Sequence, residues 1–174
     1  MDKKIGHRRK NFEERIDLAG EYRWGDIGQI TLALIFVIGM CLDVFFLKIK
    51  VPYFEIIPIY VQILIAIPLL IISGYLARSG LNIVFREKRD NLQVIHHGVF
   101  SLVRHPVYLG SILLFLSFAV LSLSIIAIII WVIIIFFYIY LASYEEKLLI
   151  NKLGQDYERY IKDVPMFIPR VFRR

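Results

Sequence analysis

Two pairs of ionisable residues flank the longest apolar run of the chain. Arg104 and His105 stand just before it, and Glu145 and Glu146 follow its end. Pro106 favours an extended residue before it and a helical turn after it, so Arg104 and His105 are expected at a helix N-terminus. The free backbone N–H groups there, together with the Arg104 cation, favour an anionic group such as a carboxylate or a phosphate. The alternative is that both side chains only anchor the helix at lipid headgroups.

The glutamate pair could supply a carboxylate to the same site. Successive residues of a helix point about 100° apart, so only one of Glu145 and Glu146 is expected to face inward. That carboxylate can pair with Arg104 or with a cationic ligand. The alternative is a pair of solvated charges at the point where a helix leaves the membrane.

Other residues that could do chemistry give weaker patterns. His96 and His97 precede Gly98 without a second ligand set of suitable spacing, so no metal site is expected. The single cysteine, Cys41, lies in an apolar run and allows neither an internal disulfide nor a thiolate cluster. Asp43 stands near the end of the same run, where it is expected to reach the interface or to cap a helix.

The chain as a whole has the composition of a membrane protein. Its 174 residues suit one domain, and 58% of them are hydrophobic, with a mean hydropathy of +0.65. The apolar runs are longer than a soluble core helix needs, which argues against a soluble protein. The formal charge of +6 comes from basic residues beside these runs, where anionic lipid headgroups explain them better than nucleic acid does.

The runs predict an all-α integral membrane protein with about four spanning helices. The run from Val107 to Tyr144 would extend ~57 Å as one helix, nearly twice the ~30 Å hydrocarbon core, so it must fold as two. Hydroxyls in the stretch 121–124 mark the reversal, which makes the last two spans a tight hairpin. The predicted spans are residues 27–47, 56–77, 107–121 and 125–143.

The basic residues predict the side of the membrane that each segment occupies. Lys and Arg number seven in 1–26, two in 48–55, five in 78–106, none at the hairpin tip and seven from residue 147 onward. By the positive-inside rule, both termini and the 78–106 loop face the cytoplasm. Residues 1–26 form a basic arm, either lying in the membrane interface or solvated as a tail.

The tail, residues 145–174, is predicted to leave the membrane as a helix. Gly154 is a possible break in it, and Pro165 and Pro169 predict an extended end. Because the tail and the 78–106 loop share one side of the membrane, they can meet and enclose a ligand.

Several motifs occur in order in the C-terminal half. They are GVFSLVRHPVYLG at 98–110, EEKLLINKLGQDYERYIKDVP at 145–165 and a closing FIP at 167–169. With these motifs the chain resembles the isoprenylcysteine carboxyl methyltransferase and phospholipid methyltransferase superfamily of integral membrane enzymes, over about residues 85–174. The resemblance implies transfer of a methyl group from S-adenosylmethionine to a lipophilic acceptor, either an isoprenylcysteine-like carboxylate or a lipid headgroup. It implies a cytoplasmic cofactor pocket between the last two spans, the turn and the tail, and no metal.

The resemblance also implies roles for individual residues. Catalytic roles fall on Arg104, His105 and Glu145, the last of which matches the cofactor-binding glutamate of the superfamily. The cofactor-binding set comprises a backbone strip, the turn after it and the glutamate: Leu92, Gln93, Val94, Ile95, Gly98, Phe100, His105, Pro106, Val107, Tyr108 and Glu145.

Two departures from the superfamily pattern leave the acceptor open. Phe100 stands where many members have Tyr, and Leu141 stands where carboxyl methyltransferases have an arginine associated with the acceptor carboxylate. The acceptor is then an amine headgroup, another lipid, or a carboxylate bound through Arg86 or Arg104. Two alternatives to a methyltransferase are a nicotinamide-dependent sterol or polyprenyl reductase of the same superfamily and a non-enzymatic membrane scaffold.

Overall fold

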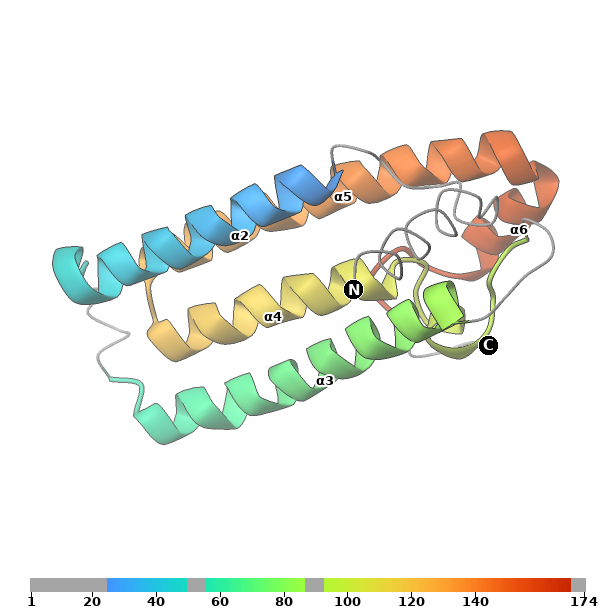
Figure 1. Ribbon diagram of the computed structural model, residues 1–174. Helices are drawn as coiled ribbons and strands as arrows, with labels where there is room; N and C mark the ends of the chain where they lie inside the picture. Colours follow the sequence, from blue (N-terminus) through green and yellow to red (C-terminus); the bar gives the residue numbers. More distant parts are fainter. Residues whose placement is uncertain (1–24, 50–55, 87–92, 170–174) are drawn as a thin grey trace, which may run out of the picture.

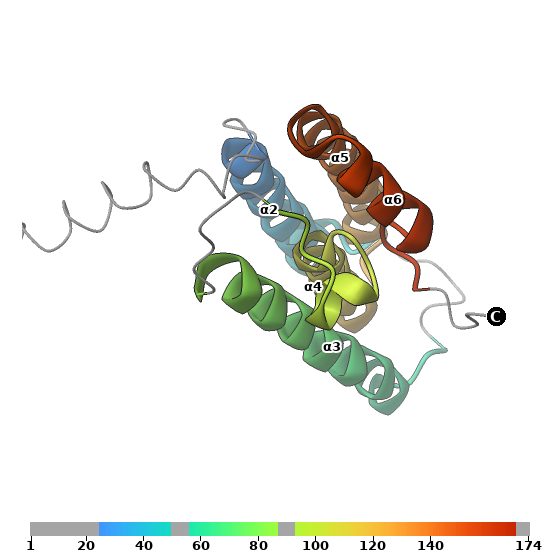
Figure 2. The same ribbon diagram turned by 90° about the vertical axis from the view of Figure 1, so that its right-hand side faces the viewer.

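The computed structural model describes residues 25–49, 56–86 and 93–169, and the regular elements in these ranges are all helical. The predicted all-α class is confirmed. In chain order the elements are α2 (Gly25–Cys41), the π-helical turn η2 (Leu42–Leu47), α3 (Ile59–Arg86), the 3-10 turn η3 (Gly98–Ser101), α4 (Pro106–Ser122), α5 (Ile125–Leu153) and α6 (Gln155–Asp163). Figure 1 shows α2 running alongside α5 and α3 alongside α4. The end-on view places α4 among α2, α3 and α5 (Figure 2).

Three segments in the described part of the chain are long and apolar enough to cross a membrane. They are Gly25–Leu47, Ile59–Arg86 and Ile125–Leu153. The fourth apolar helix, α4, has only 17 residues. At ~1.5 Å per residue it would extend about 26 Å, slightly less than the hydrocarbon core. A fourth span at α4 therefore stays a prediction.

The outer faces of the bundle carry the apolar surface that a lipid environment requires. Leu64 on α3 is 72% exposed and Phe136 on α5 is 68% exposed, and many other large apolar side chains of α2, α3 and α5 are exposed as well. The buried core lies where α2, α4 and α5 meet, around Phe36, Ile112 and Ile134.

The second span differs from the expected one at its C-terminal end. α3 continues through residues 78–86, so the expectation of a loop from 78 to 106 is wrong for these residues. The extension is amphipathic, with Gly80 buried and the Arg78 and Arg86 side chains exposed. Gly80 packs against α4 so closely that a Cβ there would lie 2.7 Å from Cγ2 of Val107. Packing against α4 thus extends a helix that hydropathy alone ends earlier.

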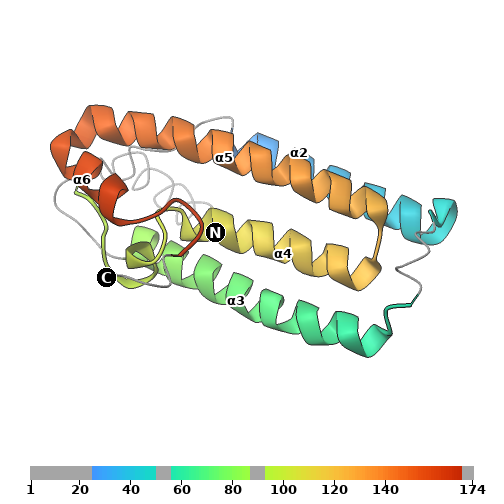
Figure 3. The same cartoon turned by 180° about the vertical axis from the view of Figure 1, so that it is seen from behind.

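The last long helix also exceeds its predicted span. α5 continues past residue 143 to Leu153, which places the glutamate pair inside a helix rather than at its exit. Gly154 then ends the helix, with a φ of +56° that glycine adopts readily. α6 folds back over the end of the bundle at which α3 ends and α4 begins, as the view from behind shows (Figure 3).

The hairpin between α4 and α5 reverses in the predicted stretch. Leu123 ends α4 in the left-handed conformation with φ 47°, and the Ser124 hydroxyl caps α5 by accepting from the backbone N–H of Ala127 at 3.1 Å. The same hydroxyl donates to the Asp43 carboxylate. Asp43 is only 2% exposed, so its carboxylate caps a helix from within the protein, as one of the two expectations for it predicted.

The α3–α4 interface depends on small residues that let the two backbones approach. A Cβ at Gly110 would lie 3.0 Å from the backbone oxygen of Ser73 and 3.2 Å from the backbone nitrogen of Ala77. The Ser73 hydroxyl donates to the Gly110 carbonyl at 2.7 Å. Small residues and interhelical hydrogen bonds are common means of helix association in membranes. This contact fixes the first turns of α4, from which the candidate site is built.

Candidate active site

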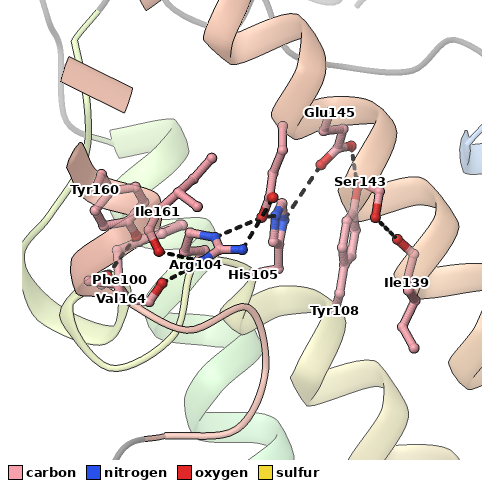
Figure 4. A network of polar contacts seen from close by, with 11 residues as sticks. Phe100, Arg104, His105, Tyr108, Ile139, Ser143, Glu145, Tyr160, Ile161 and Val164 are labelled. Carbon is pink, nitrogen blue, oxygen red and sulfur yellow. Dashed lines mark hydrogen bonds and ion pairs between the residues drawn. The ribbon is translucent and has the colours of Figure 1, made fainter. Parts of the chain in front are cut away.

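A cluster of charged and aromatic side chains lies at the end of the bundle where α4 begins. The turn before α4 is shaped by Gly98, whose φ of +59° would strain any residue with a side chain. A Cβ there would also lie 2.7 Å from Cδ1 of Ile83, so this side chain would have to shift. Pro106 opens α4 as its first residue, as predicted. Arg104 and His105 precede it, and Figure 4 shows His105 and Tyr108 side by side beneath Glu145 of α5.

Most hydrogen-bond donors of the Arg104 guanidinium are paired with other groups of the protein. Its Nε and Nη2 atoms donate to the two carboxylate oxygens of Glu146, at 2.7 and 3.2 Å. Its Nη1 atom donates to the backbone carbonyls of Ile161, at 3.1 Å, and Val164. The side chain is 9% exposed. This bidentate pair joins α5 to the turn before α4, and the two carbonyl contacts join both to the tail.

His105 lies between the two glutamates. Its Nε2 atom is 3.1 Å from Oε1 of Glu146, and its Nδ1 atom is 3.7 Å from Oε2 of Glu145. The His105 side chain is 8% exposed, and those of Glu145 and Glu146 are 16% and 11% exposed. The expectation that only one glutamate faces inward is wrong, because the imidazole fills the angle between the two directions in which neighbouring residues of α5 point.

Tyr108, in the first turn of α4, completes the polar cluster and extends it with aromatic rings. Its hydroxyl donates to Oε1 of Glu145. Its ring stacks on the His105 ring with 5.5 Å between centroids, and it lies 5.1 Å from the ring of Tyr138. Phe167 of the tail approaches His105 from another direction, at 6.1 Å between centroids. The site therefore combines carboxylates with π surfaces, both of which attract cations.

The tail is fixed to the turn by its backbone and by one tyrosine. The N–H groups of Arg104 and His105 donate to the carbonyls of Pro165, at 2.9 Å, and Met166, at 3.3 Å. The Tyr160 hydroxyl donates to the Phe100 carbonyl at 2.7 Å. Burial raises the pKa of this hydroxyl above its usual value, so it remains a donor at neutral pH.

The structure brings together part of the predicted site. Arg104, His105, Tyr108 and Glu145 meet in one cluster, and the carbonyl of Phe100, in the turn η3, binds Tyr160 of the tail. The side chains of Pro106 and Val107 pack on α3 at Gly80.

The predicted backbone strip is described in part. Leu92 lies outside the described residues, and Gln93 is exposed. Val94 packs against the tail cluster around Tyr157 and Tyr160. Among the described residues of the strip, no polar contact joins Gln93, Val94 or Ile95 to the charged cluster, so the role of this strip in cofactor binding remains a prediction.

Three residues of the cluster were not among the predicted site residues. Glu146 was set aside by the one-inward argument, although its position beside Glu145 was the available signal. Tyr138 stands seven residues before Glu145, on the same face of α5. It was not predicted because it lies within an apolar run and was taken as part of the span. Phe167 belongs to the closing motif of the tail, which carried no residue-level prediction.

No group of three or more His, Cys, Asp or Glu side chains in the described ranges is arranged to hold a metal ion. His96 is exposed, and its Nδ1 atom lies 3.2 Å from the Val94 carbonyl. The chemistry available to the cluster is therefore that of carboxylates, an imidazole, an arginine and tyrosine hydroxyls.

The apolar helices of spanning length and the buried charged cluster at one end define an all-helical integral membrane protein with an enzyme-like site. The profile of the phospholipid methyltransferase family (PEMT) matches residues 59–156, more than half of the chain. The chain belongs to this family, which is part of the isoprenylcysteine carboxyl methyltransferase-like superfamily, and it is a membrane methyltransferase. A comparison with curated proteins gives no match. The matched range contains α3, α4, α5 and the whole charged cluster, whereas α2 lies outside it.

Proposed function

We propose that this protein transfers a methyl group from S-adenosylmethionine to the amine headgroup of a membrane lipid. The observation that carries the proposal is the placement of His105, just before α4, between Glu145 and Glu146 and against the tail. This cluster lies inside the range that matches a methyltransferase family, which favours methyl transfer over the reductase and scaffold alternatives.

The residues of the cluster suit the chemical groups of S-adenosylmethionine. A carboxylate such as Glu145 can accept hydrogen bonds from an ammonium or a ribose hydroxyl. The rings of Tyr108 and Phe167 can lie against a sulfonium cation. The backbone N–H groups of Val107 and Tyr108 belong to the first turn of α4 and have no partner within the helix, so they can bind the carboxylate of the cofactor.

An amine acceptor agrees with the charges at the site better than a carboxylate does. A carboxylate needs a cation, but Leu141 is 1% exposed within the apolar core and four N–H groups of Arg104 donate to Glu146, Ile161 and Val164. Arg86 ends α3 with an exposed side chain, and among the described residues no hydrogen bond or ion pair joins it to the charged cluster. The groups that remain are carboxylates and hydroxyls, which accept hydrogen bonds from an amine.

The protein has little bond chemistry to perform. When bound, the cofactor supplies an activated methyl group, which passes to the acceptor nitrogen as the sulfur–carbon bond breaks. An ammonium must first lose a proton, which the Glu145 carboxylate can accept. Arg104 holds Glu146 and the tail in place, and the tail excludes water from the cluster. Alignment and electrostatic complementarity are then the main sources of rate acceleration.

The orientation in the membrane follows from the basic residues. The ends of α3 and α5 that carry the cluster adjoin the segments richest in Lys and Arg, so we place the site and both termini in the cytoplasm. A cysteine-accessibility measurement on each side of sealed vesicles tests this orientation.

The function is tested with the purified protein in nanodiscs that contain phosphatidylethanolamine. Labelled S-adenosylmethionine is added, and methylated lipid is sought by mass spectrometry. The expected product carries one or more added methyl groups on nitrogen. Methylation of a farnesylcysteine analogue instead, with no amine product, would show that the acceptor is a carboxylate.

Variants assign the site residues in the same preparation. His105→Ala and Glu145→Gln should abolish binding of S-adenosylmethionine in a calorimetric titration while membrane insertion is unchanged. Lys147→Ala, an exposed position on the same helix, is the matched control and should bind as the wild type does. Wild-type affinity in both site variants would contradict the proposed roles.

A further inference from the structure

We propose that α2 is part of the functional site, and that Gln29 positions Glu145 through Tyr138 and Tyr108. The inference rests on the proposed function, because Glu145 is taken as a cofactor contact. It extends that function to a helix outside the range that matches the family, so the family match does not predict it.

The first link joins α2 to α5. The Tyr138 hydroxyl donates to Oε1 of Gln29 at 3.4 Å, a long hydrogen bond. Tyr138 is 4% exposed and lies in the apolar core, where a buried phenol generally needs a partner for its hydroxyl. Gln29 is half-buried and stands in the second turn of α2. A half-buried amide in an apolar environment costs free energy unless it has a hydrogen-bond partner, so polar residues in spans usually mark a function.

The second link joins Tyr138 to the glutamate. The rings of Tyr138 and Tyr108 lie 5.1 Å apart at an angle of 35°, and Tyr108 in turn stacks on His105. The Tyr108 hydroxyl donates to Glu145. The orientation of the Tyr108 ring, and with it the position of the carboxylate, is therefore set on one side by His105 and on the other by Tyr138.

The register of α2 against α5 is fixed closely enough to transmit such an effect. A Cβ at Gly28 would lie 2.7 Å from the Phe137 ring, and one at Gly39 would lie 2.6 Å from Cδ1 of Ile130. Both glycines are therefore sites of close helix contact. Since Gly28 and Phe137 are the chain neighbours of Gln29 and Tyr138, the same contact holds the polar pair in register.

Gln29 and Tyr138 are thus positioning residues, since neither is placed in contact with the reacting groups. A purely structural role would lower stability without a selective effect on the cofactor. A positioning role predicts weaker cofactor binding that depends on the hydrogen bond itself and that a different acceptor at position 29 restores.

The test is a double-mutant cycle on the affinity for S-adenosylmethionine, measured by calorimetric titration of the full chain in nanodiscs. Gln29→Leu and Tyr138→Phe should each weaken binding about 3- to 10-fold, as expected for one hydrogen bond. The double variant should bind no more weakly than Tyr138→Phe alone, because the Gln29–Tyr138 hydrogen bond is already absent in that single variant. Gln29→Glu keeps an acceptor for the hydroxyl and should bind within about twofold of the wild type.

The control is Ile30→Ala, a 62% exposed neighbour on α2, which should bind as the wild type does. Wild-type affinity in Gln29→Leu and Tyr138→Phe, or fully additive losses without rescue by Gln29→Glu, would overturn this inference and leave the proposed function standing. A wild-type protein without affinity for S-adenosylmethionine would overturn both. If Gln29→Leu also melts at a lower temperature, rescue of affinity by Gln29→Glu separates positioning from loss of fold.

Discussion

Arg104 holds both carboxylate oxygens of Glu146, 42 positions further along the chain, in a bidentate pair with distances of 2.7 and 3.2 Å. The sequence placed Arg104 at a helix N-terminus as a possible ligand for an anion. In the structure its guanidinium instead ties α5 and the tail to the turn before α4. Arg104 therefore holds the site together, and the proposed ligand contacts are made by nearby residues such as Tyr108 and Glu145.

Arg104→Ala should destabilise the protein by about 3–5 kcal/mol, because it leaves the buried Glu146 carboxylate without its main partner. The measurement is thermal unfolding in detergent. Arg159→Ala is the matched control: its pair with Asp156, at 3.6 Å, is 72% and 74% exposed and should contribute less than about 1 kcal/mol. Equal effects of the two substitutions would contradict this account of Arg104.

Gly110→Ala should destabilise the protein by about 1–3 kcal/mol, because the new methyl group meets the α3 backbone at Ser73 and Ala77. Since α4 carries Tyr108 and begins directly after His105, binding of S-adenosylmethionine should weaken as well. Gly74→Ala is the contrasting change in α3, where a Cβ meets nothing within 4 Å. It should stabilise the protein by about 0.5–1 kcal/mol through helix propensity. Thermal unfolding of the two variants compares these effects.

Asp43→Ala and Ser124→Ala should each cost about 1–2 kcal/mol, because each removes a cap at the start of α5. Asp43 accepts from the Ser124 hydroxyl and from the backbone N–H of Ile49, the latter at 3.0 Å. Their effects should be non-additive, because the two side chains bond to each other. Unfolding of the single and double variants measures this coupling, and strict additivity would argue against a shared cap.

Tyr160→Phe should lower the free energy of unfolding by about 1 kcal/mol at neutral pH, through loss of the bond to the Phe100 carbonyl. Burial raises the pKa of Tyr160 in the folded protein above the ~10 of an unfolded chain. A raised folded pKa gives stability that is complete below pH ~10 and is lost as the pH rises through the folded value. The stability difference between wild type and Tyr160→Phe should therefore be constant up to pH ~10 and shrink above it. A difference that grows with pH would refute this.

Sequence patterns predicted the features that local chemistry determines. The hairpin reversal, the helix start at Pro106 and the break at Gly154 follow from residues with strong local preferences, and each lies where expected. The meeting of His105 with Glu145 followed from placing both on one side of a membrane, and the structure puts them 3.7 Å apart.

The errors came from features that packing determines. Residues 78–86 read as a loop because Arg78 and Arg86 end the apolar run, whereas contact of Gly80 with α4 keeps them helical. Glu146 was discounted because neighbouring residues of a helix point about 100° apart, so that only one of them was expected to face a single partner surface. The link from Gln29 to Tyr138 joins residues far apart in the chain, and no local pattern marks it.

The overlength of α5 has a consequence for how a lipid meets this protein. Its 29 residues extend ~44 Å, about 14 Å more than the hydrocarbon core, which leaves the final turns among the polar headgroups. Glu145 and Glu146 lie in that final part, so under the proposed function they would meet the amine of a lipid at headgroup level. A lipid acceptor would then remain in its own leaflet and arrive by lateral diffusion, while the water-soluble donor alone would have to enter from the aqueous phase.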